Sequence, residues 1–136
     1  MNPLALEKVL WIKPGKGIAA AGHIPAESEF FKDHFPGFPI LPGVLALEML
    51  KQTAEHYLRI GGGASPSQRF SLKQIRATKF SMYLKPGDEW ESRLELVSET
   101  EGETQWDAQL FSHGRAAVTA KLTLAKVPHP EAYALS

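Results

Sequence analysis

Two residues near the middle of the chain carry side chains suited to proton transfer. His34 lies in a segment rich in proline and aromatic residues, and Glu48 lies in the apolar segment that follows. If that segment is a helix, Leu45, Leu47 and Met49 surround Glu48, and a desolvated carboxyl favours its protonated form and suits a general acid. The alternative is that Glu48 caps or pairs at an exposed edge and that His34 is an ordinary loop histidine. Spacing alone leaves both interpretations open.

The clearest apolar pattern in the chain predicts a helix over residues 43–60, which places Glu48 in its second turn. Its apolar residues recur at spacings of three and four, and no proline interrupts them. They are Val44, Leu47, Leu50, Ala54, Tyr57 and Leu58. Leu45 and Met49 widen this stripe beyond one face, so we expect a buried helix. The three glycines at 61–63 predict its end.

Alternating patterns predict strands before and after this helix. They cover residues 5–13, 17–24, 70–84, 90–96, 106–110 and 118–124. We expect the first two to form a hairpin and the third to contain a bulge near residues 75–77. Turns at 85–88, near 102 and at 113–114 predict three successive hairpin connections, and hence an antiparallel meander with one buried face. A buried helix and a one-sided sheet satisfy each other when the sheet curls around the helix.

Length and composition predict one ordinary domain over residues 1–136, with an irregular tail at 127–136. Fifteen basic and fifteen acidic residues give a formal net charge of zero, so no overall field favours nucleic acid. The absence of cysteine excludes disulfides, thiolate catalysis and cysteine-bound metals. No stretch approaches the roughly 20 apolar residues that cross a bilayer. We therefore expect a cytoplasmic protein with no membrane or nucleic-acid partner.

The other histidines show no spacing typical of metal ligands, and a surface position is expected for each. They are His23, His56, His113 and His129. No metal site is predicted from the sequence.

The run from His34 to Gln52 resembles the signature of the 3-hydroxyacyl-[acyl-carrier-protein] dehydratase family. In this chain it reads HFPGFPILPGVLALEMLKQ, and every fixed position of the signature is present. A weaker similarity extends from about Lys8 through the turn at 85–88 to the last strand. The resemblance implies an α+β hot-dog fold, in which a long central helix is wrapped by a curled antiparallel sheet. The periodicities predict the same arrangement independently.

The resemblance also implies roles for the residues of the run. His34 would be the base that takes the α proton of a 3-hydroxyacyl thioester, and Glu48 the acid that protonates the departing hydroxyl. The amide of Gly43, at the positive end of the helix, would bind the thioester carbonyl oxygen. Gln52, one turn beyond Glu48, would orient its carboxyl.

The implied product is a trans-2-enoyl thioester of fatty acid or related acyl-chain biosynthesis, formed without metal or redox cofactor. The substrate would carry phosphopantetheine, as an acyl carrier protein or coenzyme A thioester. Phe35 and Phe38 are expected to line its binding site. In the family, the histidine and the acid of one site come from different subunits, which implies a homodimer and allows larger assemblies of dimers.

Two other functions fit the same residues. In a hot-dog thioesterase, Glu48 would activate water against the thioester carbonyl, although the complete loop around His34 argues against it. In a non-catalytic acyl-thioester-binding subunit, the signature would persist while Phe38 blocks the tunnel. A further choice concerns Arg76, Lys79 and Lys85, which form either a small basic patch for an acidic carrier or a solvated strand face.

Overall fold

The computed structural model describes residues 5–25, 41 and 43–127 of the chain. Within them, two strands precede a helix and four strands follow it, which confirms the predicted succession. The elements are β1 (Lys8–Lys13), β2 (Gly17–His23), α1 (Gly43–Ile60), β3 (Arg69–Phe80), β4 (Glu89–Thr100), β5 (Glu103–Ser112) and β6 (Arg115–Val127). The predicted bounds of the helix are confirmed. Val127 still belongs to β6, so the irregular tail expected from 127 onward is wrong at that residue, and residues 128–136 lie outside the described part.

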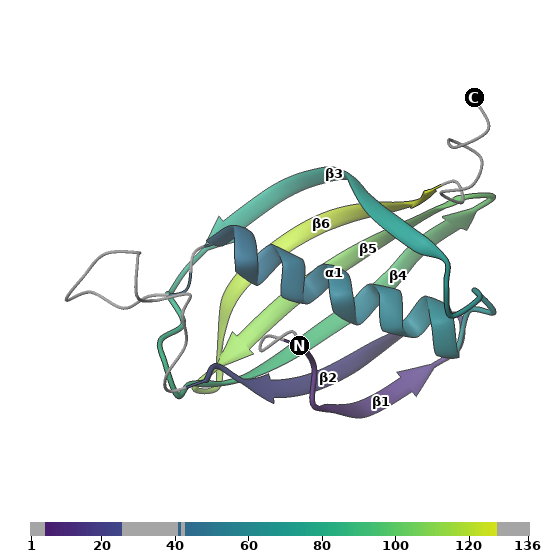
Figure 1. Cartoon of the computed structure of the whole chain (residues 1–136). Coiled ribbons are helices and arrows are strands. Elements are labelled where there is room, and N and C mark those ends of the chain that lie inside the picture. The colour runs from purple at the N-terminus through teal and green to yellow at the C-terminus, as the bar shows by residue number, and fades with distance from the viewer. Residues whose placement is uncertain (1–4, 26–40, 42, 128–136) are drawn as a thin grey trace, which may run out of the picture.

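The strands form one antiparallel sheet that curves around α1 (Figure 1). Their order across the sheet is β1-β2-β4-β5-β6-β3, so β1 and β3 are its two edges. The helix packs against the inner face of the sheet, and the side chains along the first half of β4 and along β5 alternate between buried and more exposed positions. Successive side chains of β6 are buried at 117–118 and 122–124. This arrangement confirms the predicted helix wrapped by a one-sided sheet.

The turn at 85–88 is present, but the hairpin predicted there is wrong. Gly87 has a φ of 87°, and the amide of Asp88 donates to the carbonyl of Lys85 over 3.0 Å. Proline before a positive-φ glycine is typical of a type II turn. The strand before this turn ends at Phe80 rather than continuing to residue 84, and it pairs with β6 instead of β4. Turn chemistry is local and says nothing about which strands become neighbours.

The bulge predicted in the third strand is confirmed. The register between β3 and β6 shifts between Arg76 and Lys79, and Ala77 lies there with a φ of 51°. An extra residue in one strand of a pair bends that strand and increases its twist. Beyond Leu72, β3 is exposed along its whole length, as expected for an edge strand with one neighbour.

The core lies between α1 and the sheet. Tyr57 of the helix meets Trp106 of β5 edge to face, with ring centroids 5.2 Å apart. The Tyr57 hydroxyl accepts a hydrogen bond of 2.7 Å from the amide of Gly15, which fastens the helix to the β1–β2 turn. The expected burial of the whole apolar stripe is wrong at Val44, which is 71% exposed. Periodicity places Val44 on the apolar stripe, but the described residues leave most of its side chain uncovered.

Candidate active site

The predicted site residues divide into two groups. Gly43, Glu48 and Gln52 lie on α1, within its first ten residues. His34, Phe35 and Phe38 lie outside the described residues, and their predicted positions stay predictions. The described half of the site is therefore the first three turns of the helix and what packs around them.

Gly43 is the first residue of α1, as the oxyanion role requires. The first amides of a helix have no acceptor within it and point toward its positive end. The aromatic ring of Phe80 packs directly on this glycine: a Cβ built on Gly43 would lie 2.8 Å from Cε1 and 3.0 Å from Cζ of that ring. This close approach gives a structural reason for glycine at the helix start. Sequence reasoning did not connect Phe80 with the site, because it assigned Phe80 to the interior of a strand.

Glu48 lies in the second turn and is only half-buried, with 45% of its side chain exposed. The prediction that apolar residues surround Glu48 is wrong within the single chain. The nearest charged group is the ammonium of Lys51, with Nζ 3.8 Å from Oε1. A carboxyl in this position can exchange a proton with a bound molecule, because one side of it is open.

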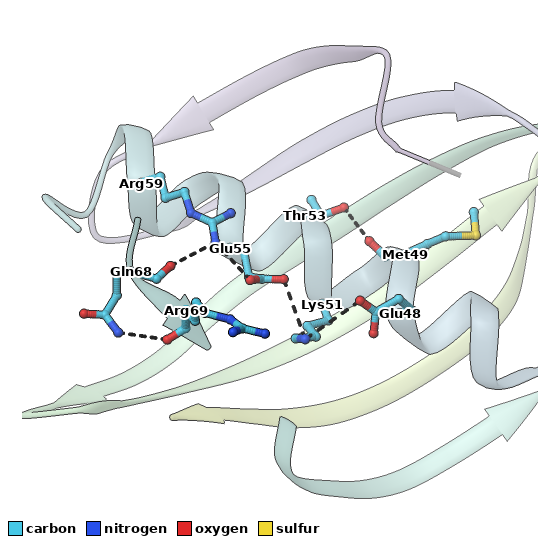
Figure 2. A network of polar contacts seen from close by, with 8 residues as sticks. All are labelled: Glu48, Met49, Lys51, Thr53, Glu55, Arg59, Gln68 and Arg69. Atoms are coloured by element: carbon cyan, nitrogen blue, oxygen red, sulfur yellow. Dashed lines mark hydrogen bonds and ion pairs between the residues drawn. The ribbon is translucent and has the colours of Figure 1, made fainter. Parts of the chain in front are cut away.

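The Glu48 carboxylate ends a row of four charges along one side of α1 (Figure 2). Lys51 Nζ also lies 3.9 Å from Oε1 of Glu55, and Glu55 accepts from Arg59 over 3.2 Å. Arg59 donates in addition to the carbonyl of Gln68 over 3.0 Å, which anchors the row to the loop before β3. Lys51 is largely buried, so it is held against the helix rather than free in solvent.

Among the described residues, no hydrogen bond joins Gln52 to Glu48, and the orienting role of Gln52 stays a prediction. Gln52 is partly buried one turn after Glu48, but Lys51 is the side chain that lies beside the Glu48 carboxylate. A hydrogen bond at this spacing depends on the rotamers of both side chains, which sequence does not specify.

Several large apolar side chains are exposed around the helix start. Val44 follows Gly43 on α1, Phe80 packs against Gly43 from the end of β3, and Tyr83 is exposed close after it in the chain. Ile75 is exposed further along the same edge strand. Exposed apolar side chains that gather at one place mark a binding region more often than single exposed residues do, and the contacts here establish that Phe80 lies beside the helix start.

The three basic residues considered for a carrier-binding patch are exposed. They are Arg76 and Lys79 on β3 and Lys85 in the turn after it. Among the described residues, no three histidine or acidic side chains gather closely enough to hold a metal ion. In the same part of the chain, no helix is long and apolar enough to span a membrane.

One hollow of the described residues is not lined by Glu48. A trough of about 640 Å³ lies at the ends of β1, β2, β4 and β5, and its rim carries His23 and His113. His23 pairs with Glu7, and His113 pairs with Asp88 over 2.9 Å. The sequence indicated only that these histidines lie at the surface, which is confirmed; their carboxylate partners come from distant segments.

Solved structures show the class of fold. A chain of the dehydratase heterocomplex ApeI:P from Xenorhabdus doucetiae superposes with a TM-score of 0.78 over 99% of this chain and 91% of its own length, at 19% identity. A mutant of the fluoroacetyl-CoA-specific thioesterase FlK superposes with a TM-score of 0.70 over 92% of this chain and 94% of its own length, at 12% identity. The curled sheet around one helix is the hot-dog fold.

Sequence comparison identifies the family within that fold. Residues 12–121 match the family model described as ApeI-like, ApeI dehydratase. The 3-hydroxyacyl-[acyl-carrier-protein] dehydratase FabZ of Dechloromonas aromatica (strain RCB) is 33% identical over 125 residues, which cover 90% of this chain and 87% of the relative. FabZ of Haemophilus influenzae (strain 86-028NP) is 34% identical over 127 residues, which cover 90% and 83%.

The chain therefore belongs to the 3-hydroxyacyl-[acyl-carrier-protein] dehydratase family, and it matches the ApeI-like model within it. Its reaction is the dehydration of a 3-hydroxyacyl thioester, the chemistry of a hydro-lyase. The resemblance found in the run from His34 to Gln52 is confirmed at the level of the family and the reaction.

Proposed function

We propose that the chain dehydrates 3-hydroxyacyl groups carried by an acyl carrier protein, with His34 as base and Glu48 as acid. The observation that supports these roles is the position of Glu48 in the second turn of a helix that begins at Gly43 and follows the segment containing His34. Elimination of water needs a base at the α carbon, a proton donor at the departing hydroxyl, and a donor to the carbonyl oxygen. These three requirements match His34, Glu48 and the Gly43 amide in turn.

The proposed steps balance without any cofactor. His34 removes the α proton while electron density moves onto the thioester carbonyl oxygen, which accepts from the Gly43 amide. Glu48 then protonates the 3-hydroxyl, the carbon–oxygen bond breaks, and water leaves with formation of the trans double bond. No electrons are gained or lost overall, so the reaction needs no redox partner.

The carrier protein is proposed over coenzyme A on two grounds. The relatives named above are acyl-carrier-protein dehydratases. Arg76, Lys79 and Lys85 are exposed on the β3 edge and the turn that follows, where they can meet an acidic carrier. The acyl chain would pass between Phe35, Phe38 and the exposed apolar residues around the helix start. The cytoplasm is the compartment we propose.

The test of the reaction is a product assay. Purified protein is incubated with 3-hydroxyacyl thioesters of carrier protein and of coenzyme A, and the enoyl thioester is separated from free acid. Enoyl product supports the proposal, and a preference for the carrier thioester supports the partner. Free acid as the main product would indicate a thioesterase, and no turnover of any substrate would indicate a binding subunit.

We further propose that the working unit is a homodimer with shared sites. Within the single chain, Glu48 is half-exposed, and Val44, Phe80 and Tyr83 leave apolar surface open beside it. Among the described strands, none lies beyond β3 in the sheet, so a second copy can pair with this edge. The partner would cover the apolar residues and supply His34 to the Glu48 of this chain.

Subunit mixing tests the shared site. If each site is shared between two subunits, the His34→Ala and Glu48→Gln proteins are each inactive, but a mixed dimer retains one site with both groups native. Random exchange of equal amounts should restore about a quarter of the wild-type activity, since half of the dimers are mixed and each has one working site. Mixed dimers proven by mass measurement but lacking activity would contradict sharing, and a monomeric wild-type protein that turns over substrate would contradict the dimer.

A further inference from the structure

The short segment Leu84–Asp88, which we call the clasp, holds the chain on both sides of residues 26–40. On one side, the amide of Ile24 donates to the carbonyl of Asp88 over 2.7 Å, and the amide of Gly87 donates to the carbonyl of Ile24 over 2.8 Å. On the other side, the amide of Leu41 donates to the carbonyl of Leu84 over 2.7 Å. Five consecutive residues therefore fix two positions that are seventeen residues apart in the chain.

The two anchored residues and one residue of the clasp are buried. Ile24, Leu41 and Leu84 are almost completely excluded from solvent. A buried backbone hydrogen bond is expensive to break, because the freed amide and carbonyl cannot turn to water. The two anchor points are accordingly part of the core rather than of the surface.

The side chain of Asp88 maintains the shape of the clasp. Its Oδ2 accepts a hydrogen bond of 2.8 Å from the amide of Lys85, which closes the turn from the side opposite the bond from the Asp88 amide. Only 14% of this side chain is exposed, although aspartate is usually found at the surface. Its hydrogen bonds offset the cost of burying the carboxylate.

Asp88 also connects the clasp to a third segment. Its Oδ1 lies 2.9 Å from Nε2 of His113, which belongs to the two-residue turn between β5 and β6. His113 and Gly114 have φ values of 53° and 73°, so this is the mirror-image turn that matches the twist of a hairpin. One carboxylate thus joins the clasp to a rigid hairpin end.

We propose that Asp88 is a positioning residue for the dehydration reaction, acting through the clasp to fix both ends of the segment that carries His34. The inference rests on the proposed role of His34 as the base. An error of about 1 Å in the placement of a reacting group can lower a rate by about a hundredfold. Loosening the two anchors would misplace the base without removing any group that touches the substrate.

The test compares three variants. Asp88→Ala removes both side-chain contacts and should lower kcat by roughly tenfold with KM within about twofold, because the position of the base matters for proton transfer in the transition state and little for substrate binding. Asp88→Asn keeps the shape and an oxygen that can accept from Lys85, so it should restore most of the rate. Asp107→Ala is the matched control, since it removes an aspartate that pairs with Lys121 over 2.9 Å on the outside of the sheet.

A second readout does not depend on turnover. Amide hydrogen exchange at Ile24 and Leu41 should be at least about tenfold faster in Asp88→Ala than in Asp107→Ala, because both amides donate into the clasp. His113→Asn removes the contact between Asp88 Oδ1 and the imidazole of His113, and it tests the positioning role in case Asp88→Ala does not fold. Asparagine tolerates a positive φ, so the turn survives while the imidazole contact is lost, and we expect a fall in kcat of about threefold.

The outcomes separate this inference from the proposed function. Unchanged kcat and unchanged exchange at Ile24 and Leu41 in a folded Asp88→Ala protein would overturn the positioning role while leaving dehydration intact. An equal loss of kcat in Asp107→Ala and Asp88→Ala would also overturn the positioning role of Asp88. Absence of enoyl product from the wild-type protein would instead overturn the proposed function, and the exchange measurement would still report whether the clasp holds.

Discussion

The two halves of α1 differ in how completely the chain covers them. In the C-terminal half, Tyr57 packs against Trp106 and accepts from Gly15, and Arg59 is tied to the carbonyl of Gln68. In the N-terminal half, Val44 is exposed and Glu48 is half-exposed. The C-terminal half is therefore tied to the sheet and to two loops, although Ile60 at its end is 62% exposed. The N-terminal half buries Met49 and Leu50 in the core but leaves Val44 and Glu48 open to solvent.

The two halves of α1 are therefore expected to contribute differently to stability and to activity. Buried apolar contacts and satisfied hydrogen bonds stabilise the C-terminal half within one chain. In the proposed function, the N-terminal half supplies the Gly43 amide, the Glu48 carboxyl and apolar surface to a substrate and a second subunit. Changes in the first turns should thus alter activity more than stability, and changes near Tyr57 should do the reverse.

The largest effect is expected at Glu48. Glu48→Gln keeps the size of the side chain but removes its proton-donating group, so kcat should fall by roughly a hundredfold or more while the melting temperature stays close to that of the wild type. Steady-state kinetics and thermal unfolding measure the two quantities. Glu55→Gln is the matched control on the same helix, and a comparable loss of kcat in that variant would show that the charge row, rather than Glu48 itself, sets the rate.

The next effect is expected at the helix start. Gly43→Ala places a Cβ 2.8 Å from Cε1 of Phe80, so the ring must move, and kcat should fall by about tenfold because the oxyanion amide lies at the same position. The fold should survive, since Phe80 is itself partly exposed and its ring can shift.

A double-mutant cycle checks the cause. In a Phe80→Ala background the clash is absent, so adding Gly43→Ala should lower kcat much less than it does in the wild type. Equal losses in both backgrounds would mean that contact with Phe80 is not what glycine provides at this position.

The parts of the fold that depend on local spacing could be predicted from the sequence. The bounds of α1 follow from a three-and-four repeat ended by glycines, and the bulge near Ala77 follows from a slip in alternation within one strand. The pairing of β3 with β6 could not be predicted, because it joins segments separated by two other strands. The Lys85–Asp88 turn has the same local chemistry whether or not the flanking strands are neighbours.

The candidate site shows the same limit. The run from His34 to Gln52 identified the family and the helix that carries Glu48, because those features are written in consecutive residues. The side chains that surround the site come from elsewhere: Phe80 from β3 packs on Gly43, and Asp88 braces the clasp. Their positions follow from tertiary packing, and no spacing rule connects them to the run. Val44 was misplaced for a related reason, since periodicity shows which residues share a face but not what covers that face.

A smaller effect, on stability alone, is expected in the covered half. Tyr57→Phe removes the hydroxyl that accepts from the Gly15 amide and leaves that amide without its acceptor, which should cost about 1 kcal/mol. For a chain of this size, that loss lowers the melting temperature by about 3–5 °C. Calorimetry measures the shift, and kcat should be unchanged. Ser67→Ala, which removes an exposed loop hydroxyl, is the control; an equal shift there would argue against the Tyr57 contact.

The smallest effect concerns the pH dependence of stability in the same half. Burial on α1, with a further contribution from the positive charge of Arg59, lowers the pKa of His56 below its ordinary value of 6.5. Between the lowered folded pKa and 6.5, the unfolded chain binds more protons at this position than the folded chain does. Stability therefore rises with pH through that window, and the destabilisation caused by protonating His56 is fully present below the folded pKa.

Urea unfolding of wild type and His56→Gln at about pH 5 and about pH 8 isolates the contribution of this side chain. The wild type should gain more stability than the variant between the two conditions, and equal gains would show that His56 is as easily protonated in the folded chain as in the unfolded one.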